Sequence, residues 1–475
     1  MGIQEVLEVE EQFPELFDHE NDGEEVFDWE LFNDCNYDAF SEVYDRQDHA
    51  DVDVLREAVR NRDLDLMLQI LEKPYLMIKK TRVWAERDIV KAATEEFSET
   101  STFLEKAIEI CGPYVWKRYD ILVMPPSFPF GGMENPCLTF VTPTIIAGDK
   151  SLASVIAHEI THSWTGNLVT NRNFEHFWLN EGFTVFVEFK ILGAMYGKEY
   201  RDFQSLLGLG ELRDCMNVQL KETPELQKLV VDLTDLSPDD AYSTVPYIKG
   251  STFLRYLEDL FGGPAIFDPF LQFYLNKYKY KSILTDDFKQ TVFEYFHDTK
   301  YSDILSKIDW DKWLHGTGMP PIIPDFDTSL VDVAQKHVEL WKSSDIQEIE
   351  KSPLLKSSLS SLQVKEMLTK LLEVKFSVDK LNALAKAYKL SETKNSEIRF
   401  LFLRLCIRAR NVAAIDDIIA FANSNFRMKF VRPVYKELSQ WPEMRERAIE
   451  NFHRVKDQMM KTCAVQVAND MGISM

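Results

Sequence analysis

The sequence predicts a mainly α-helical fold with a small β part. Strand signals are almost absent from residue 328 onward, where apolar residues recur at helical spacing. The clearest apolar stripe consists of Val364, Met367, Leu368, Leu371 and Leu372. Two short apolar runs of strand length, residues 119–124 and 138–141, account for the β part. With 475 residues the chain is long enough for two to four domains.

Residues 1–80 are expected to form an acidic N-terminal segment that is partly disordered. Residues 1–45 contain 16 Asp and Glu and no Lys or Arg, while the whole chain has a net charge of −23. Acidic residues mixed with aromatic ones are typical of a docking segment that folds on a protein partner, or of a solvated tail. Apolar periodicity over residues 51–72 predicts a helix. The acidity argues against a nucleic-acid partner.

Residues 81–315 have a mixed pattern that predicts one domain. A helix over residues 86–111 is expected to end at Gly112, and a buried strand over residues 119–124 to end before Pro125. The next expected elements are a Gly-rich turn over 130–136, a strand over 138–141, a helix over 150–168 capped by Ser151 or Ser154, and further helices to about Leu314. Residues 316–327 are a Pro-rich linker, and residues 328–475 predict a second domain of stacked antiparallel helices, as in armadillo or HEAT solenoids.

The pattern His-Glu-x-x-His at residues 158–162 predicts a metal site on the helix over 150–168. His158 and His162 lie four residues apart, so both imidazoles project from one helix face. Eighteen residues separate the pattern from Glu181, which lies at the start of another apolar run and can supply a third ligand. Three protein ligands leave one position open for water, as in a catalytic zinc site. Glu159 is placed to accept a proton from that water.

Glu188 is a candidate for orienting one of the ligands. It lies seven residues after Glu181, which is two turns along the same face of a helix. A carboxylate there can accept the free ring N–H of a ligating His and fix its tautomer. The alternative is an ordinary solvated glutamate. For His158 and His162, the alternative is a pair of polar side chains on a helix surface.

Composition indicates a cytoplasmic protein. Six cysteines are widely spaced with no Cys-x-x-Cys pair, as expected of reduced thiols. The chain opens without the pattern of a secretory signal, and its apolar runs are too short to span a membrane.

Three motifs together resemble the zinc aminopeptidases of the gluzincin type, peptidase family M1. The motifs are Gly131-Gly132-Met133-Glu134-Asn135, His158-Glu159-Ile160-Thr161-His162 and Glu181. Residues 126–143, 163–171 and 427–430 look especially similar to the leukotriene A4 hydrolase branch of the family. The resemblance implies a thermolysin-like zinc peptidase domain followed by an α-helical C-terminal domain. It also implies that the β-rich domain that precedes them in the family is missing from this sequence.

The resemblance implies one zinc ion per chain, held by His158, His162 and Glu181, with Glu159 as general base. It also implies a substrate site around the residues Gly131, Gly132, Met133, Glu134 and Asn135, in which Glu134 binds the free α-amino group of a peptide. Tyr247 matches a tyrosine that donates a hydrogen bond to the tetrahedral oxyanion. The remaining matches are Tyr242, a second tyrosine of the site, Asp239, which directs water in the epoxide hydrolase branch, and Arg427 and Lys429, which bind a substrate carboxylate.

Three hypotheses for function follow. The first is a zinc aminopeptidase that removes N-terminal residues from short peptides with a free N-terminus. The second is opening of a fatty-acid epoxide in the same site, which Asp239, Tyr242, Arg427 and Lys429 permit. The third is a truncated, non-catalytic interaction protein that uses its acidic N-terminus to bind a protein partner.

Overall fold

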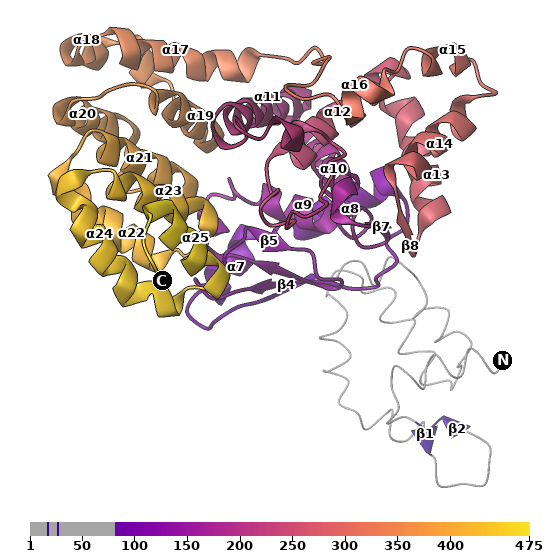
Figure 1. Ribbon diagram of the computed structural model, residues 1–475, viewed down its shortest axis with the longest axis horizontal. Coiled ribbons are helices and arrows are strands. Elements are labelled where there is room, and N and C mark those ends of the chain that lie inside the picture. Colours follow the sequence, from indigo (N-terminus) through magenta and orange to yellow (C-terminus); the bar gives the residue numbers. More distant parts are fainter. Residues whose placement is uncertain (1–16, 19–25, 28–80) are drawn as a thin grey trace, which may run out of the picture. The chain divides into compact units, whose positions relative to one another are not determined.

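The computed structural model describes residues 17–18, 26–27 and 81–475 (Figure 1). The chain divides into two compact units, Met1–Thr81 and Arg82–Met475. In the first unit, β1 (Phe17–Asp18) pairs antiparallel with β2 (Val26–Phe27). The helix predicted over residues 51–72 lies outside the described residues. The partial disorder predicted for residues 1–80 stays a prediction, because only four residues of that segment are described. The second unit contains every candidate site residue.

The second unit begins with a small mixed sheet. Its strands are β3 (Thr81–Trp84), β4 (Tyr119–Val123), β5 (Gly132–Met133) and β6 (Leu138–Val141), in the order β3-β4-β6-β5. Strand β4 runs parallel to β6, with Asp120 opposite Leu138, and β5 runs antiparallel to β6. The two predicted strands are confirmed. The predicted Gly-rich turn over 130–136 is wrong in part, because Gly132 and Met133 hydrogen-bond to β6 as an edge strand.

The helices of this region surround a core of aromatic side chains. They are α7 (Val90–Glu96), α8 (Thr100–Cys111), α9 (Ser154–Thr161), α10 (Trp178–Tyr196), α11 (Lys198–Asp214), α12 (Gly250–Leu260), α13 (Pro264–Tyr278), α14 (Thr285–Phe296), α15 (Ser302–Leu305) and α16 (Trp310–Leu314). Helix α10 packs against α9, α11 and α12 and is the central element. Strands β7 (Val169–Asn171) and β8 (Lys281–Ile283) pair in parallel.

Two helices differ from their predicted bounds. The helix predicted over 86–111 is two helices, α7 and α8. The Ser98 hydroxyl donates to Glu95 O and the Thr100 hydroxyl to Phe97 O, and such local bonds compete with continuation of a helix. The helix predicted over 150–168 covers only Ser154–Thr161.

The predicted cap of that second helix, α9, is also wrong. Its N-cap is Ala153, which makes no side-chain cap bond. The Ser151 hydroxyl donates to Asp149 instead, so it is not free to cap the helix. At the other end the chain leaves the helix at His162 and turns at Gly166 before β7 begins. The helix therefore ends directly at the second histidine of the motif.

Residues 316–318 of the predicted linker are fixed by a buried lysine. Lys249 is 1% exposed, and its Nζ donates to Gln227 O at 2.9 Å, Gly316 O at 2.7 Å and Gly318 O at 3.0 Å. Three carbonyl acceptors match the three protons of an ammonium group. The start of the linker therefore lies tightly on the preceding helices.

The C-terminal part consists of helices in two layers (Figure 1). They are α17 (Ser329–Ser343), α18 (Ile346–Lys351), α19 (Ser361–Leu371), α20 (Val378–Tyr388), α21 (Ser396–Arg408), α22 (Ile415–Ser424), α23 (Met428–Ser439), α24 (Pro442–Val455) and α25 (Lys461–Met471). Helix α19 packs against α17 and α21, and α23 packs against α21 and α25. Contact between every second helix is typical of a solenoid built from helix pairs.

The apolar stripe predicted on α19 is confirmed as part of the C-terminal core. Val364, Met367, Leu368 and Leu371 are buried, and Leu372 packs against them while partly exposed. Across the described residues, no helix combines the length and the apolar character needed to cross a membrane.

Candidate metal centre

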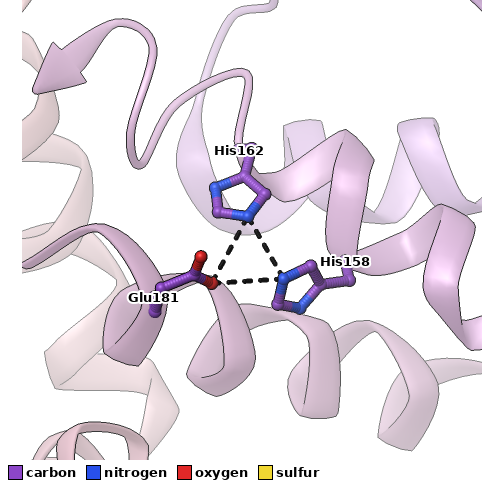
Figure 2. A group of neighbouring side chains, drawn as sticks. All are labelled: His158, His162 and Glu181. Atoms are coloured by element: carbon purple, nitrogen blue, oxygen red, sulfur yellow. Dashed lines mark hydrogen bonds and ion pairs between the residues drawn. The ribbon is translucent and has the colours of Figure 1, made fainter. Parts of the chain in front are cut away.

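The three predicted ligands converge on one point (Figure 2). His158 lies in the last turns of α9 and His162 closes that helix, so their Nε2 atoms are 3.1 Å apart. Glu181 lies in the first turn of α10, which packs against α9. Its Oε2 is 3.3 Å from His158 Nε2 and 3.5 Å from His162 Nε2. The packing of two helices thus assembles a donor set of two imidazoles and one carboxylate.

The chemistry of this group fits a divalent metal ion. Burial alone would raise the pKa of Glu181, but His162 and His158 lower that pKa to about 2, so the carboxylate is ionised. Among the described residues, no hydrogen-bond donor reaches its buried Oε2. A buried anionic oxygen without a donor is costly unless a cation neutralises it. Each of the three residues offers one ligand atom within 4.8 Å of the others, and two nitrogens with one oxygen suit zinc.

Both imidazoles are oriented through their outer ring nitrogens. His158 Nδ1 donates to Glu188 Oε2 at 2.9 Å, which is the contact expected from the spacing of Glu188 and Glu181. The Glu188 side chain is 12% exposed, so the alternative of a solvated glutamate is wrong. His162 Nδ1 donates to the carbonyl of Thr165 at 2.9 Å, with the Thr184 hydroxyl 3.1 Å away. These two bonds hold both Nε2 atoms toward Glu181.

Glu159 lies beside the metal-ligand group and against strand β5. Its side chain is buried, and no donor in the described part of the chain reaches Oε2. Burial raises the pKa of the Glu159 carboxyl to about 7. A Cβ atom on Gly132 would lie 2.1 Å from Glu159 Oε1, so only glycine leaves room for the carboxylate. A divalent cation nearby would favour its charged form.

The backbone of the Gly-Gly-Met-Glu-Asn motif places Glu134 on the same side. Glu134 Oε1 lies 4.0 Å from His162 Nδ1, and Glu134, Glu159 and His162 form a second close group of donor atoms. Asn167 Nδ2 donates to Glu134 O at 2.7 Å and holds this backbone in place. Of the other motif residues, Met133 is exposed and Asn135 is half-buried.

The two candidate tyrosines meet beside His158. Tyr247 lies in a π-helical turn, η6 (Val245–Lys249), and its ring stacks on that of His158 at 6.4 Å between centroids. The hydroxyls of Tyr242 and Tyr247 are 3.1 Å apart. Burial raises the pKa of Tyr247, and the charge of Glu181 raises it further, so its hydroxyl keeps its proton. Tyr242 is 59% exposed.

Asp239 is not part of this cluster. It is exposed, its backbone N–H donates to Ser237 Oγ at 3.3 Å, and its carboxylate makes no contact with the predicted ligands in the described structure. Arg427 and Lys429 lie at the start of α23, and both pair with Glu397 Oε1, at 3.5 Å and 2.9 Å.

Sequence reasoning missed four contributors to the site, Thr165, Thr184, Asn167 and Glu397. Thr165 acts through its backbone carbonyl, which no side-chain pattern reveals. Thr184, Asn167 and Glu397 contact their partners only through the fold. Thr165 and Asn167 lie in the residues 163–171 on which the resemblance rests, and that was the one signal that the sequence offered for them.

Two family models match this chain. Residues 93–313 match the peptidase family M1 domain, and residues 359–471 match the C-terminal domain of leukotriene A4 hydrolase. The region over residues 93–313 therefore belongs to peptidase family M1. Both predicted histidines, Glu181 and Tyr247 lie in the M1 region, and Arg427 and Lys429 lie in the second region.

Named relatives of this chain are similar to it over most of its length. Leukotriene A-4 hydrolase of Xenopus laevis is 45% identical over 83% of this chain and 65% of its own. Leucine aminopeptidase 2 of Ajellomyces capsulatus is 38% identical over 82% of this chain and 63% of its own. Yeast leukotriene A4 hydrolase, solved in complex with bestatin, is 36% identical over 82% of this chain and 65% of its own, with a TM-score of 0.76. The chain thus spans just under two thirds of each relative.

Proposed function

We propose that this chain is a zinc-dependent aminopeptidase that hydrolyses the N-terminal peptide bond of short peptides. The observation that carries the proposal is the convergence of His158, His162 and Glu181 within 4.8 Å, beside the buried carboxylate of Glu159. The similarity to a leucine aminopeptidase supports the same reaction class.

Substrate binding would use the two ends of a short peptide. Glu134 accepts hydrogen bonds from the free α-ammonium group, which restricts cleavage to the first residue. Arg427 and Lys429 bind the C-terminal carboxylate. Gly131 and Gly132 carry no side chains, so the peptide backbone can approach the strand that precedes Glu134.

Hydrolysis would rest on four residues around the ligands. His158, His162 and Glu181 would hold the zinc ion, which when bound would supply Lewis-acid chemistry and lower the pKa of a bound water. Glu159 takes the proton from the attacking water and delivers it to the leaving amine. Tyr247 donates its hydroxyl proton in a hydrogen bond to the oxyanion, and Tyr242 orients that hydroxyl. Glu188 keeps the ring of His158 in the orientation for metal binding.

The test measures zinc content and hydrolysis of aminoacyl-p-nitroanilides by the purified full-length chain. The unmutated chain should hold one zinc ion and be active. Glu159→Gln should keep the zinc and lose activity by at least about 10²-fold, whereas Glu188→Gln should weaken zinc retention about tenfold or more. The exposed Glu199→Gln is the matched control and should change neither. An active Glu159→Gln variant would remove Glu159 from the role of general base.

Epoxide opening is the second candidate, because a leukotriene hydrolase is 45% identical to this chain. The exposed position of Asp239 gives this candidate less support than the peptidase reaction. Product analysis after incubation with a fatty-acid epoxide, compared with nitroanilide hydrolysis by the same preparation, separates the two. Activity in neither assay, with zinc bound, would favour the non-catalytic interaction protein. A cytoplasmic location and a protein partner for residues 1–80 stay predictions.

A further inference from the structure

A buried carboxylate lies between the two cations that we assign to the peptide's C-terminal end. Glu397 is in the first turn of α21, and Arg427 and Lys429 are at the start of α23. Lys429 Nζ is 2.9 Å and Arg427 Nη1 is 3.5 Å from the same atom, Glu397 Oε1. A single oxygen therefore sets the positions of both cationic groups.

Glu397 is held rigidly and is ionised. Its side chain is 7% exposed, and its backbone N–H donates to the helix cap Asn395 at 3.0 Å. Burial alone would raise its pKa, but Lys429, Lys365 and Arg427 lower that pKa to about 2. By contrast, 43% of the Lys429 side chain is exposed and can meet a ligand.

Arg427 is fixed at the metal-centre side of this cluster. The N–H groups of its neighbours Phe426 and Met428 donate to the carbonyls of Pro126 and Pro129, at 3.1 Å and 2.9 Å. Its Nη2 would lie 2.6 Å from a Cβ on Gly131. Gly131 precedes Gly132, which lies against Glu159, so one dipeptide separates the general base from the guanidinium.

The charges at this point sum to a single positive charge, because two cations share one anion. The nearby Lys365 pairs with Glu211 of α11 at 3.1 Å and adds no net charge. One peptide carboxylate would neutralise this charge, and a second carboxylate would be left without a partner.

We propose that Glu397 is a positioning residue that holds Arg427 and Lys429 and limits their net charge, so that the site selects peptides whose C-terminal residue carries one negative charge over those that carry two. This inference rests on the proposed function and adds a specificity to its carboxylate end. An uncharged residue at position 397 would leave the positive charges of Arg427 and Lys429 unbalanced. It would also hold these two side chains less firmly in place.

The experiment measures binding of three tripeptides that differ only at the third residue, by calorimetry on the full-length zinc-loaded chain. The Glu159→Gln background prevents turnover. The peptides end in alanine amide, in alanine and in aspartate, so their C-terminal residues carry zero, one and two negative charges. In this parent, the alanine acid should bind at least tenfold more tightly than the amide, and more tightly than the aspartate peptide.

Adding Glu397→Gln should shift the ratio of aspartate-peptide to alanine-peptide affinity at least fivefold toward aspartate. The shift should shrink as salt rises. Glu397→Asp keeps the charge and should keep the parent ratio. Glu437→Gln is the matched control, because Glu437 Oε1 also holds two cations, Arg404 and Arg408, at 2.7 Å and 2.8 Å. It should leave the ratio unchanged.

An equal effect of Glu397→Gln on all three peptides would overturn the inference. So would a shift of the ratio in the Glu437→Gln control as large as that in Glu397→Gln. If Glu397→Gln does not fold, Lys429→Met tests the same charge balance. It leaves no net charge, so it should abolish the preference for the acid over the amide, and retention of that preference overturns the proposal. If the unmutated chain binds no zinc or hydrolyses no peptide, that result contradicts the proposed function and not this inference. The ratios of peptide affinities can still be measured in that case.

Discussion

Two adjacent glycines serve two different charged groups. A Cβ on Gly132 would meet Glu159 Oε1 at 2.1 Å, and a Cβ on Gly131 would meet Arg427 Nη2 at 2.6 Å. A side chain at either position would therefore force the neighbouring charged group to move, and the constraint comes from this close approach and not from the backbone angles. The dipeptide therefore leaves room for the carboxylate of Glu159 on one side and the guanidinium of Arg427 on the other.

Alanine at these two positions should affect catalysis differently. Gly132→Ala displaces Glu159 and should lower kcat by at least about 10² on every substrate. Gly131→Ala displaces Arg427 and should raise KM for peptides with a free C-terminal carboxylate, but leave C-terminal amides nearly unchanged. Steady-state kinetics on a matched acid and amide check both expectations.

Gly210→Ala is the control for this pair. The nearest atom to a Cβ there is Lys370 Nζ at 3.8 Å, which is an ordinary contact. If Gly131→Ala and Gly132→Ala changed kcat and KM in the same way, the separate assignments would be wrong.

At the level of single residues, spacing in the sequence predicted the candidate metal ligands and Glu188, but not the contacts of Glu397. His158, His162, Glu181 and Glu188 follow helical geometry, and the structure brings them together. Glu397 could not be predicted, because its contacts to α23 depend on how helices distant in sequence pack. Asp239 shows the reverse, since a residue matched by resemblance lies exposed on a loop.

At the level of elements, Lys249 joins the π-helical turn η6 to the start of the linker. Its ammonium group satisfies three carbonyls, two of which belong to Gly316 and Gly318. Lys249→Met would remove these donors and leave buried acceptors unpaired. It should lower the free energy of unfolding by about 3 kcal/mol. Urea denaturation followed by circular dichroism measures this change.

The control for Lys249→Met is Lys307→Met, at an exposed lysine. It should change the free energy of unfolding by less than about 0.5 kcal/mol. A similar loss in both variants would show that the effect comes from general charge removal and not from the three carbonyls.

Element boundaries were the weakest part of the sequence predictions. The strands over 119–123 and 138–141 were readable because prolines and glycines bound them. Hydroxyl groups at Ser98 and Thr100 divide one predicted helix, and Asp149 holds the serine that was expected to cap α9. Local side-chain bonds of this kind compete with the helix ladder, and periodicity does not report them.

For the whole molecule, a bound metal ion would join two helices that are separated by a loop in the sequence. Because zinc binding requires α9 and α10 in their folded arrangement, zinc should stabilise the folded chain by about 2.7 kcal/mol at one hundred times its dissociation constant. A chelator should therefore lower the unfolding midpoint, and added zinc should restore it. Calorimetric scans with and without zinc test this.

Glu181→Ala serves as the control for this effect. It removes one ligand and should abolish most of the zinc-dependent shift. An equal shift in Glu181→Ala would place the stabilising ion elsewhere in the chain.

The π-helical turn η6 has one further consequence. Five residues occupy a turn that ordinary helical winding would close with fewer, and α12 continues directly from it. Deleting a single residue from this turn would rotate everything before it by about 100° relative to α12. The direction of the Tyr247 phenol is thus set by the length of the polypeptide at this point, and a one-codon deletion beside Tyr247 would redirect its hydroxyl although the tyrosine itself is retained.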